Sequence, residues 1–455
     1  DKGAWRHYVR PVLYWSGFLV TLYFLMMCLN IMLKRQWVER ERLSFPVAQI
    51  PLGIVDPSVG LFRSRLFWWS CGGAASLNLL NGLHRLFPLI PGPTYGKFNF
   101  GALLTEHPWN VIGDVHVEFL PFVVGLSYFI PVGLSFSIWF FYWFWKAQHV
   151  LGAAVGLHYI PNFPGFWIQG MGAMMLMAFL FLYSARRHLR AVAGALRGRE
   201  NAAADDSPYR FAVWGAIASG LALLTFLYVA GMSMWIGGLF LAGHVAMTMV
   251  TTRLRAQLGP PTHELPFTTS SMLVGLVGLK RLDTRSLAQV AAFKFVDFGQ
   301  RGSPMPTMME SMYMRDKLRL RQPAILLGAI MFAAVLGTVV GFAGNLQRGH
   351  VDTVQTWVGH SAFPRLSAQI RDHTDGVDFV YVAYFIVGAG VVVGLNALSR
   401  AYVWWPFHPL GYIMGGEWML RHLWFPIFMA WGIRVLVLKL GGMSAHRKAA
   451  HVFLG

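Results

Sequence analysis

The sequence predicts an all-α fold, a polytopic transmembrane helix bundle of about 9 to 12 spans with re-entrant or broken helices. Composition is the first observation behind this prediction. Hydrophobic residues make up 55% of the 455 residues and charged residues only 13%, whereas a soluble chain carries about a quarter charged residues. The second observation is that the apolar residues form blocks close to the ~20 residues that a helix needs to cross a bilayer.

The predicted spans follow one another along the whole chain. They cover residues 12–33, 66–87, 119–145, 166–185, 210–229, 232–250, 323–344, 378–398 and 419–438. Basic clusters at 34–42, 186–199, 253–255 and 315–321 border these spans. Because Lys and Arg are enriched in cytoplasmic loops, we expect these clusters inside the cell and the loop 89–118, with its acidic residues, outside.

Three parts are expected along the chain. Residues 1–250 would form an N-terminal transmembrane bundle, and residues 323–455 a C-terminal one. Between them, 251–322 has basic flanks and a helical spacing of apolar residues in 284–298, which indicates a cytoplasmic amphipathic segment on the membrane surface. The chain starts without Met and ends on an apolar run, so we expect it to be part of a longer protein.

Three segments are predicted to be broken helices. Residues 43–53 form an apolar run too short to span, with Pro46 and Pro51 inside it. Residues 147–165 must recross the membrane, or a neighbouring span must be a hairpin, if the basic clusters on either side are both cytoplasmic. Residues 402–418 carry two further prolines. Transporters use such broken helices to expose backbone groups to a solute.

Polar residues in apolar segments are candidates for a substrate path. Ionisable and amide side chains are costly at membrane depth, so they are rare there unless they have a role. The alternative role for each is a hydrogen bond between helices or, for the broken segments, a purely architectural hairpin. The candidate polar residues are Gln49, Asn78, Asn81, Gln169, His244, Asn396 and His408. Pro46 and Pro51 join them because a broken helix frees backbone groups beside each proline.

One loop holds a pattern typical of a metal site. Asp114, His116 and Glu118 alternate with apolar residues, and on an extended strand they would point to one face. His107 lies just upstream. Imidazole and carboxylate groups suit zinc or another divalent ion. The alternative is an ordinary solvated loop.

Several other functions are disfavoured by the sequence. It has no Gly-rich phosphate loop, no His-Glu-x-x-His motif and no nucleophile elbow, so we expect no enzyme activity and no cofactor. The two cysteines, Cys28 and Cys71, lie in apolar spans and exclude a disulfide framework. The net charge of +18 lies in loops beside the spans, and therefore implies no nucleic-acid partner.

The chain resembles a bacterial family of uncharacterised polytopic membrane proteins, a domain of unknown function that is itself distantly similar to oligopeptide transporters. The resemblance rests on segments 37–46 (WVERERLSFP), 125–128 (GLSY), 137–142 (SIWFFY), 184–189 (SARRHL), 209–210 (YR), 252–256 (TRLRA) and 406–412 (PFHPLGY). It covers nearly the whole chain and implies an inner-membrane location. It transfers no substrate residue, since the transporter motif has only a differently spaced echo at 98–107.

Three functions follow from these observations, and a membrane-embedded metalloenzyme that uses His107, Asp114, His116 and Glu118 ranks last. The other two are ranked above it. The first is a secondary transporter or permease for a small polar solute, peptide-like or a metal chelate, with a path along 43–53 and 402–416. The second is a non-catalytic scaffold or accessory subunit of a larger membrane complex. In either case we expect the lipid bilayer as the main partner, with homo-oligomers or partner subunits as alternatives.

Overall fold

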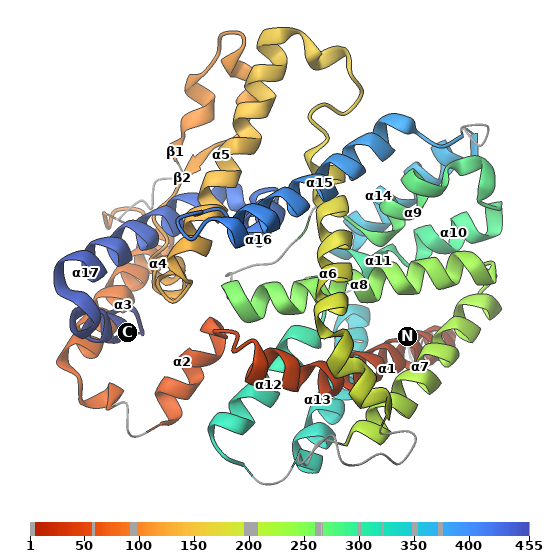
Figure 1. Cartoon of the computed structure of the whole chain (residues 1–455), viewed down its shortest axis with the longest axis horizontal. Coiled ribbons are helices and arrows are strands. Elements are labelled where there is room, and N and C mark those ends of the chain that lie inside the picture. The colour runs from red at the N-terminus through yellow and green to blue at the C-terminus, as the bar shows by residue number, and fades with distance from the viewer. Residues whose placement is uncertain are drawn as a thin grey trace. The chain divides into compact units, whose positions relative to one another are not determined.

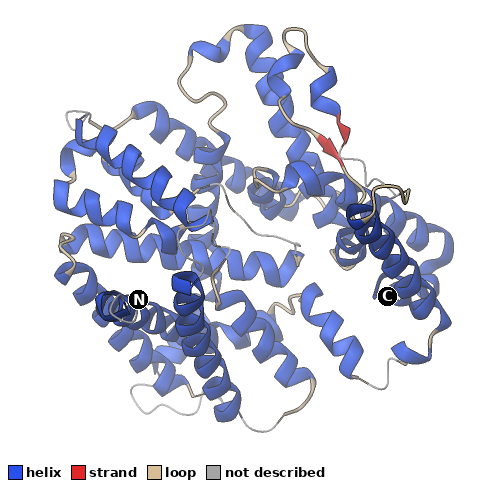
Figure 2. Cartoon of the chain, turned by 180° about the vertical axis from the view of Figure 1, so that it is seen from behind, coloured by secondary structure: helices blue, strands red, loops and turns tan. Residues whose placement is uncertain are grey.

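A computed structural model describes residues 5–56, 60–91, 98–194, 208–259, 265, 267–298, 300, 302–320, 323–347, 354–371 and 376–454. These residues are almost entirely helical, and their one sheet has two short strands (Figure 2). The all-α fold expected from composition and periodicity is therefore confirmed.

The elements follow the chain as labelled in Figure 1. The α-helices are α1 (Trp5–Arg35), α2 (Pro46–Val55), α3 (Arg65–Leu86), α4 (Pro121–Tyr128), α5 (Val132–Val155), α6 (Phe166–Gly194), α7 (Tyr209–Val229), α8 (Met234–Leu258), α9 (Thr269–Val277), α10 (Thr284–Ala292), α11 (Lys294–Asp297), α12 (Met305–Lys317), α13 (Pro323–Gln347), α14 (Val354–Arg371), α15 (Phe379–Ala401), α16 (Pro409–Gly415) and α17 (Leu420–Leu454). The strands β1 (Phe98–Asn99) and β2 (His116–Val117) pair antiparallel.

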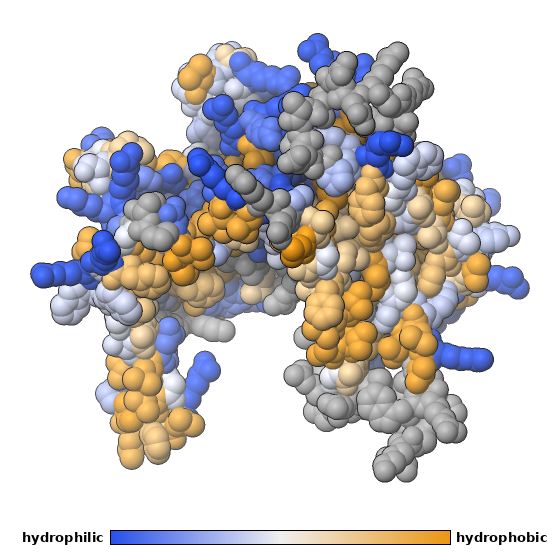
Figure 3. Space-filling model, turned by 90° about the horizontal axis from the view of Figure 1, so that it is seen from below, coloured by the Kyte–Doolittle hydropathy of each residue, from blue (hydrophilic) through white to orange (hydrophobic). Residues whose placement is uncertain are grey.

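Seven helices within the described residues are long and apolar enough to cross a membrane. They are α1, α6, α7, α8, α13, α15 and α17, and each coincides with a predicted span. Large apolar side chains such as Phe332, Leu336 and Val340 are exposed on α13. Hydrophobic residues likewise cover broad areas of the face shown in Figure 3. A surface of this kind is expected where lipid rather than water surrounds the protein.

Two predicted spans differ from the structure. Residues 66–87 do form a helix, α3, but it is not among the seven that are apolar enough to span. Residues 119–145 are not one helix, because α4 ends at Tyr128 and α5 begins at Val132. Pro131 stands directly before α5, where a residue without a backbone N–H is tolerated only at a helix start.

The segment 147–165 does not form a helix of its own. Its first half continues α5 as far as Val155, and Gly156 ends that helix with a left-handed backbone at φ 80°. A short 3-10 turn and an irregular stretch then lead to α6 at Phe166. The crossing count that led to this expectation treated 119–145 as one helix, whereas the chain forms two there, α4 and α5.

The described chain folds as two compact units, each assembled from three separate stretches. Unit 1 comprises 1–43, 177–252 and 268–382, and unit 2 comprises 44–176, 253–267 and 383–455. The predicted three-part division by membrane topology stays a prediction, because compactness does not report which side of a bilayer a segment faces.

Unit 1 is organised around α1, which packs against α7, α12 and α13. Aromatic rings fill the space between these elements: Phe18 of α1 contacts Phe226 of α7 and Phe293, with ring centroids 5.0 and 5.1 Å apart. The charged end of α1 is also held in place, since Lys34 in its last turn forms a 2.7 Å ion pair with Asp316 of α12.

Unit 2 is organised around α17, which packs against α3, α4, α5 and β2 (Figure 1). The short helix α16 lies along α5, and all its residues are buried. The two helices lie too close for a side chain at two positions of α16. A Cβ on Gly411 would lie 2.4 Å from the Cβ of Ser137, and one on Gly415 would lie 2.7 Å from the Cβ of Phe141. Glycine at both positions is therefore what lets α16 reach the core.

Candidate functional site

The candidate site lies in unit 2, where the loop before β2 meets the second half of α5. The Lys146 ammonium group donates hydrogen bonds to the backbone oxygens of Ile112 (2.6 Å) and Asp114 (3.0 Å). Both oxygens face Lys146 because Gly113 between them has φ 63° and ψ −155°, a conformation that is open essentially to glycine alone. The loop therefore holds a lysine at a defined place in the unit.

Asn99 of β1 fixes the same loop from the other side. Its side-chain oxygen accepts hydrogen bonds from the backbone N–H groups of Gly101 (3.1 Å) and Val115 (3.0 Å). Its side-chain nitrogen donates to the Asp114 carboxylate at 2.9 Å. Asp114 is consequently oriented by a neighbour rather than left free to rotate in solvent.

A second cation, Arg421, enters from the start of α17. Its Nη1 lies 3.8 Å from the Asp114 carboxylate, and its guanidinium lies 4.7 Å from the centre of the Trp418 ring. The Nε–H of Arg421 donates to Nε2 of the neighbouring His422 at 3.0 Å. Arg421 thus links the Asp114 loop to the first turn of α17.

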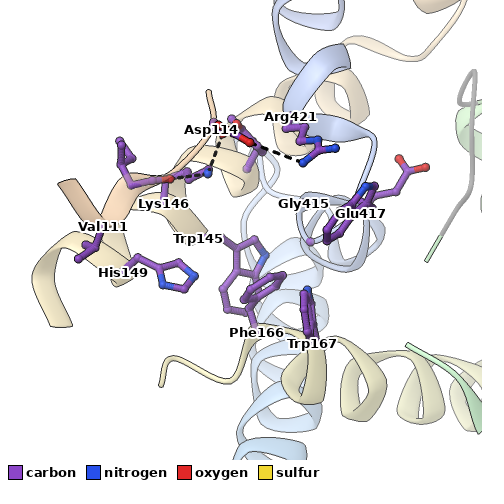
Figure 4. Close-up of a pocket in the computed structure, with 14 residues that line it drawn as sticks. Val111, Asp114, Trp145, Lys146, His149, Phe166, Trp167, Gly415, Glu417 and Arg421 are labelled. Carbon is purple, nitrogen blue, oxygen red and sulfur yellow. Dashed lines mark hydrogen bonds and ion pairs between the residues drawn. The ribbon is translucent and has the colours of Figure 1, made fainter. Parts of the chain in front are cut away.

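These groups border a pocket of about 290 Å³ (Figure 4). In Figure 4, Lys146, Asp114 and Arg421 form the charged border, and Trp145, Phe166 and Trp167 lie together below it. The complete lining is Val111, Ile112, Asp114, Tyr142, Trp145, Lys146, His149, Phe166, Trp167, Gly415, Gly416, Glu417, Trp418 and Arg421. The pocket therefore offers both charges beside aromatic walls, and it lies where two candidate spans, α6 and α17, begin.

Burial tunes the lysine of this pocket. The pKa of Lys146 is lowered to about 8, mainly by desolvation; the Asp114 carboxylate acts to raise it and the Arg421 cation to lower it. Burial, and then the positive charge of nearby Lys146, lower the pKa of His149. An anion bound beside Lys146 would favour its charged form.

A cluster of two histidines and one carboxylate adjoins this pocket. Nδ1 of His422 lies 2.6 Å from the buried Glu118 carboxylate, and the His422 ring stacks on His116 at 4.4 Å. One ligand atom from each of the three residues lies within 4.8 Å of the others. The indole N–H of Trp424 donates to the His116 backbone oxygen at 2.8 Å and holds β2 against α17.

The structure brings only some of the predicted metal ligands together. His116 and Glu118 are brought together, and His422, which the sequence analysis missed, completes their group. Asp114 lies on the same stretch but bonds to Asn99 and faces Arg421 instead. His107 is exposed in the loop upstream.

The predicted path residues near α2 take architectural places. Pro46 is the first residue of α2, and Pro51 lies inside that helix without ending it. The Gln49 amide donates to the backbone oxygen of Ser44 at 2.8 Å. Phe45 has a left-handed backbone (φ 43°) and its N–H donates to the Ala256 oxygen at 2.7 Å, which fixes the entry into α2.

The second predicted path segment reaches the pocket. Ring nitrogen Nδ1 of His408 accepts from the N–H of Leu410 at 3.1 Å and caps α16. The hydroxyl of Ser137 accepts from the His408 N–H at 2.8 Å and lies 3.0 Å from the Pro406 oxygen. The far end of the segment, at Gly415, lines the pocket.

The predicted amides make local or interhelical contacts. Gln169 is buried, accepts from the Tyr412 hydroxyl at 2.8 Å and donates to the Pro164 oxygen at 2.7 Å. Asn78 and Asn396 donate to backbone oxygens one turn earlier in their own helices. Asn81 is half-buried on α3. None of these four lines the pocket.

His244 forms a separate arrangement in unit 1. It is buried in α8, and its Nδ1 lies 3.8 Å from the fully buried Asp297 carboxylate. That carboxylate accepts hydrogen bonds from the N–H groups of Thr269 (2.9 Å) and Ser270 (2.7 Å) at the start of α9. Burial alone would raise the pKa of Asp297, but His244 and these donors hold it below its ordinary value.

Several charged residues of unit 2 could not be singled out from the sequence. Lys146, Arg421 and His422 stand at the ends of apolar runs, where charges are common and carry little information. Arg434 was hidden inside the predicted span 419–438. Its guanidinium donates to the backbone oxygens of Tyr128 (2.9 Å) and Ile130, at the end of α4. The signal that could have marked it is its rarity as a cation within a span.

Taken together, the seven candidate spans and the helical units define a multi-pass membrane protein. The family model described as "Family of unknown function (DUF6785)" matches residues 1–455, and the chain belongs to that family. Searches of curated proteins and of solved structures found no match.

Proposed function

We propose that this protein is a secondary transporter or permease for a small polar solute, and that the unit 2 pocket recognises the solute. The observation that carries the proposal is the combination of Lys146, Arg421 and Asp114 around one pocket at the start of two candidate spans. A membrane protein that only fills space has no need for a half-buried lysine beside a cavity, since the desolvation of its charge is costly.

The lining indicates the class of solute. A carboxylate would bind Lys146 and Arg421 through charge-assisted hydrogen bonds, and an ammonium group would bind Asp114. The volume of about 290 Å³ corresponds to about ten water molecules. A free amino acid or a dipeptide therefore fits the pocket in both size and charge, in line with the peptide-like solute expected from the sequence.

Part of the predicted route supports this proposal. The segment 402–416 contributes Gly415 and Gly416 to the pocket lining, whereas 43–53 contributes none of the lining residues. We therefore assign solute recognition to the segment 402–416. A role for 43–53 in the path stays a prediction from its short helix and its two prolines.

The test is uptake of radiolabelled alanyl-alanine and of alanine into proteoliposomes that contain the purified protein. Lys146→Met should reduce uptake at least tenfold at pH 7, because a bound carboxylate loses its buried partner. Lys280→Met is the matched control, since Lys280 is exposed and belongs to unit 1. The proposal is wrong if neither probe is transported by the wild type, or if both variants transport equally well.

A second candidate function is that of an accessory subunit in a larger membrane complex. Helix α13 favours it, because none of the most apolar window of Pro323–Gly344 is buried within the described chain. A partner helix could cover this surface in place of lipid. Purification from native membranes in a mild detergent would support this role if it yields a stoichiometric second chain, and a pure single chain would count against it.

A further inference from the structure

We propose that His116, Glu118 and His422 form a binding site for a divalent transition-metal ion, with zinc as the reference ion. The site is separate from the solute pocket and does not rest on the proposed transport function. It joins two distant parts of the chain, because Glu118 and His422 are 304 positions apart.

The geometry is that of converging donor atoms. One donor from each residue lies within 4.8 Å of the other two, which is a separation that a single ion can bridge with bonds of about 2.0–2.2 Å after small side-chain movements. The two rings are held nearly parallel, at 26°. The backbone behind His116 is fixed by its pairing with Asn99 in the sheet and by the Trp424 indole.

The chemistry of the donors selects the class of ion. Two imidazoles and one carboxylate are ligands of borderline character, which suit zinc and its neighbours better than calcium or magnesium. Three protein ligands also leave one coordination position for water or a solute group.

An unpaired atom distinguishes this cluster from a simple structural contact. Nδ1 of His116 is buried, and the described part of the chain offers it no hydrogen-bond partner. A buried polar atom without a partner is unfavourable and calls for an explanation. The bond between His422 and Glu118 would by itself account for an architectural role, but it leaves this atom of His116 unexplained.

Both ring nitrogens of His422 have partners in the structure. Arg421 donates to Nε2 of His422 at 3.0 Å, which makes Nε2 the acceptor and leaves the ring proton on Nδ1, directed at Glu118. Binding of an ion through Nδ1 would move that proton to Nε2 and break the Arg421 bond, so the ion and Arg421 compete for His422.

The experiment is Co²⁺ and Zn²⁺ binding to the purified full chain in detergent, after removal of bound metal with a chelator. We expect one Co²⁺ per chain, seen by its visible absorption bands, and displacement of Co²⁺ by Zn²⁺. His422→Ala and His116→Ala should each weaken Co²⁺ affinity about 100-fold or more, since each removes one of three ligands.

The matched control is His107→Ala, which removes an exposed histidine from the same loop. It should bind Co²⁺ like the wild type. Glu118→Gln keeps the shape of the side chain and should also weaken binding, so it separates loss of a ligand from failure to fold. Absence of Co²⁺ binding by the wild type, or equal affinity in wild type, His116→Ala and His422→Ala, would overturn the proposal.

Discussion

The titration of Lys146 gives the sharpest test of the electrostatics of the unit 2 pocket. Burial lowers its pKa from an ordinary value near 10.5 to about 8, a change that corresponds to about 3 kcal/mol against the charged form. We predict that the Lys146 amine titrates with a midpoint close to pH 8 in the folded protein. At pH 7 the neutral fraction would be about one tenth, about 300-fold more than for a lysine with the ordinary value.

The neighbours of Lys146 should move this midpoint in opposite directions. The Arg421 cation disfavours the charged amine, so Arg421→Gln should raise the midpoint. The Asp114 carboxylate favours the charged amine, so Asp114→Asn should lower it. A bound carboxylate solute would also raise the midpoint, because it favours the charged form. Solute affinity should consequently fall as the pH rises through 8.

The assay is pulse labelling of the full chain with an acylating reagent between pH 6 and 11, followed by peptide mass spectrometry. Only the neutral amine reacts, so the labelling rate of Lys146 follows its titration. Exposed Lys280 in the same sample is the internal control for reagent decay. A Lys146 midpoint above pH 10, or shifts of the same sign in Arg421→Gln and Asp114→Asn, would refute the electrostatic reasoning.

The lowered pKa of Lys146 also makes the free energy of unfolding depend on pH. The direction of the pKa change decides whether stability rises or falls with pH. Because the folded-state pKa of Lys146 is below its unfolded value, the unfolded chain binds more protons between pH 8 and 10.5. The free energy of unfolding of the wild type should therefore rise through that range relative to Lys146→Met. Equal pH dependence of the two proteins, measured by thermal unfolding in detergent, would contradict this.

Three further predictions concern single side chains. Gly113→Ala should lower the melting temperature, with a cost of about 1–3 kcal/mol from the strained backbone, and thermal unfolding measures it. Tyr412→Phe should destabilise by a similar ~1–3 kcal/mol, because it leaves the buried Gln169 oxygen without its donor; an unchanged melting temperature would argue against that bond. His244→Gln should lower the melting temperature, because it removes the buried imidazole that lies 3.8 Å from the fully buried Asp297 carboxylate; an unchanged melting temperature would argue against that pairing.

Membrane spans were predictable because hydropathy is a local property. Each of α1, α6, α7, α8, α13, α15 and α17 is marked by its own run of apolar residues. The break at Pro131 was missed because the apolar run continues on both sides of it. Hydropathy does not register the missing N–H of a proline, so 119–145 was predicted as one helix rather than two.

The candidate site was predictable only where its residues are close in sequence. The alternation of Asp114, His116 and Glu118 was visible in a five-residue stretch. His422 and Arg421 join them only through the packing of α17 against β2. No pattern in the sequence reports a contact across about 300 positions, and one histidine at the start of an apolar run resembles any other.

The stretches of the two units alternate along the chain. This order constrains the sequence of events during synthesis of the protein. Unit 2 begins at Ser44 but needs residues 383–455, which are synthesised after every stretch of unit 1. Helices α4 and α5 are therefore synthesised long before α16 and α17, which pack against them. We expect this interval to be the step at which synthesis depends most on insertion factors. Neither unit can be obtained as a single continuous fragment, so truncated versions ending before residue 383 should be degraded rather than accumulate as folded halves.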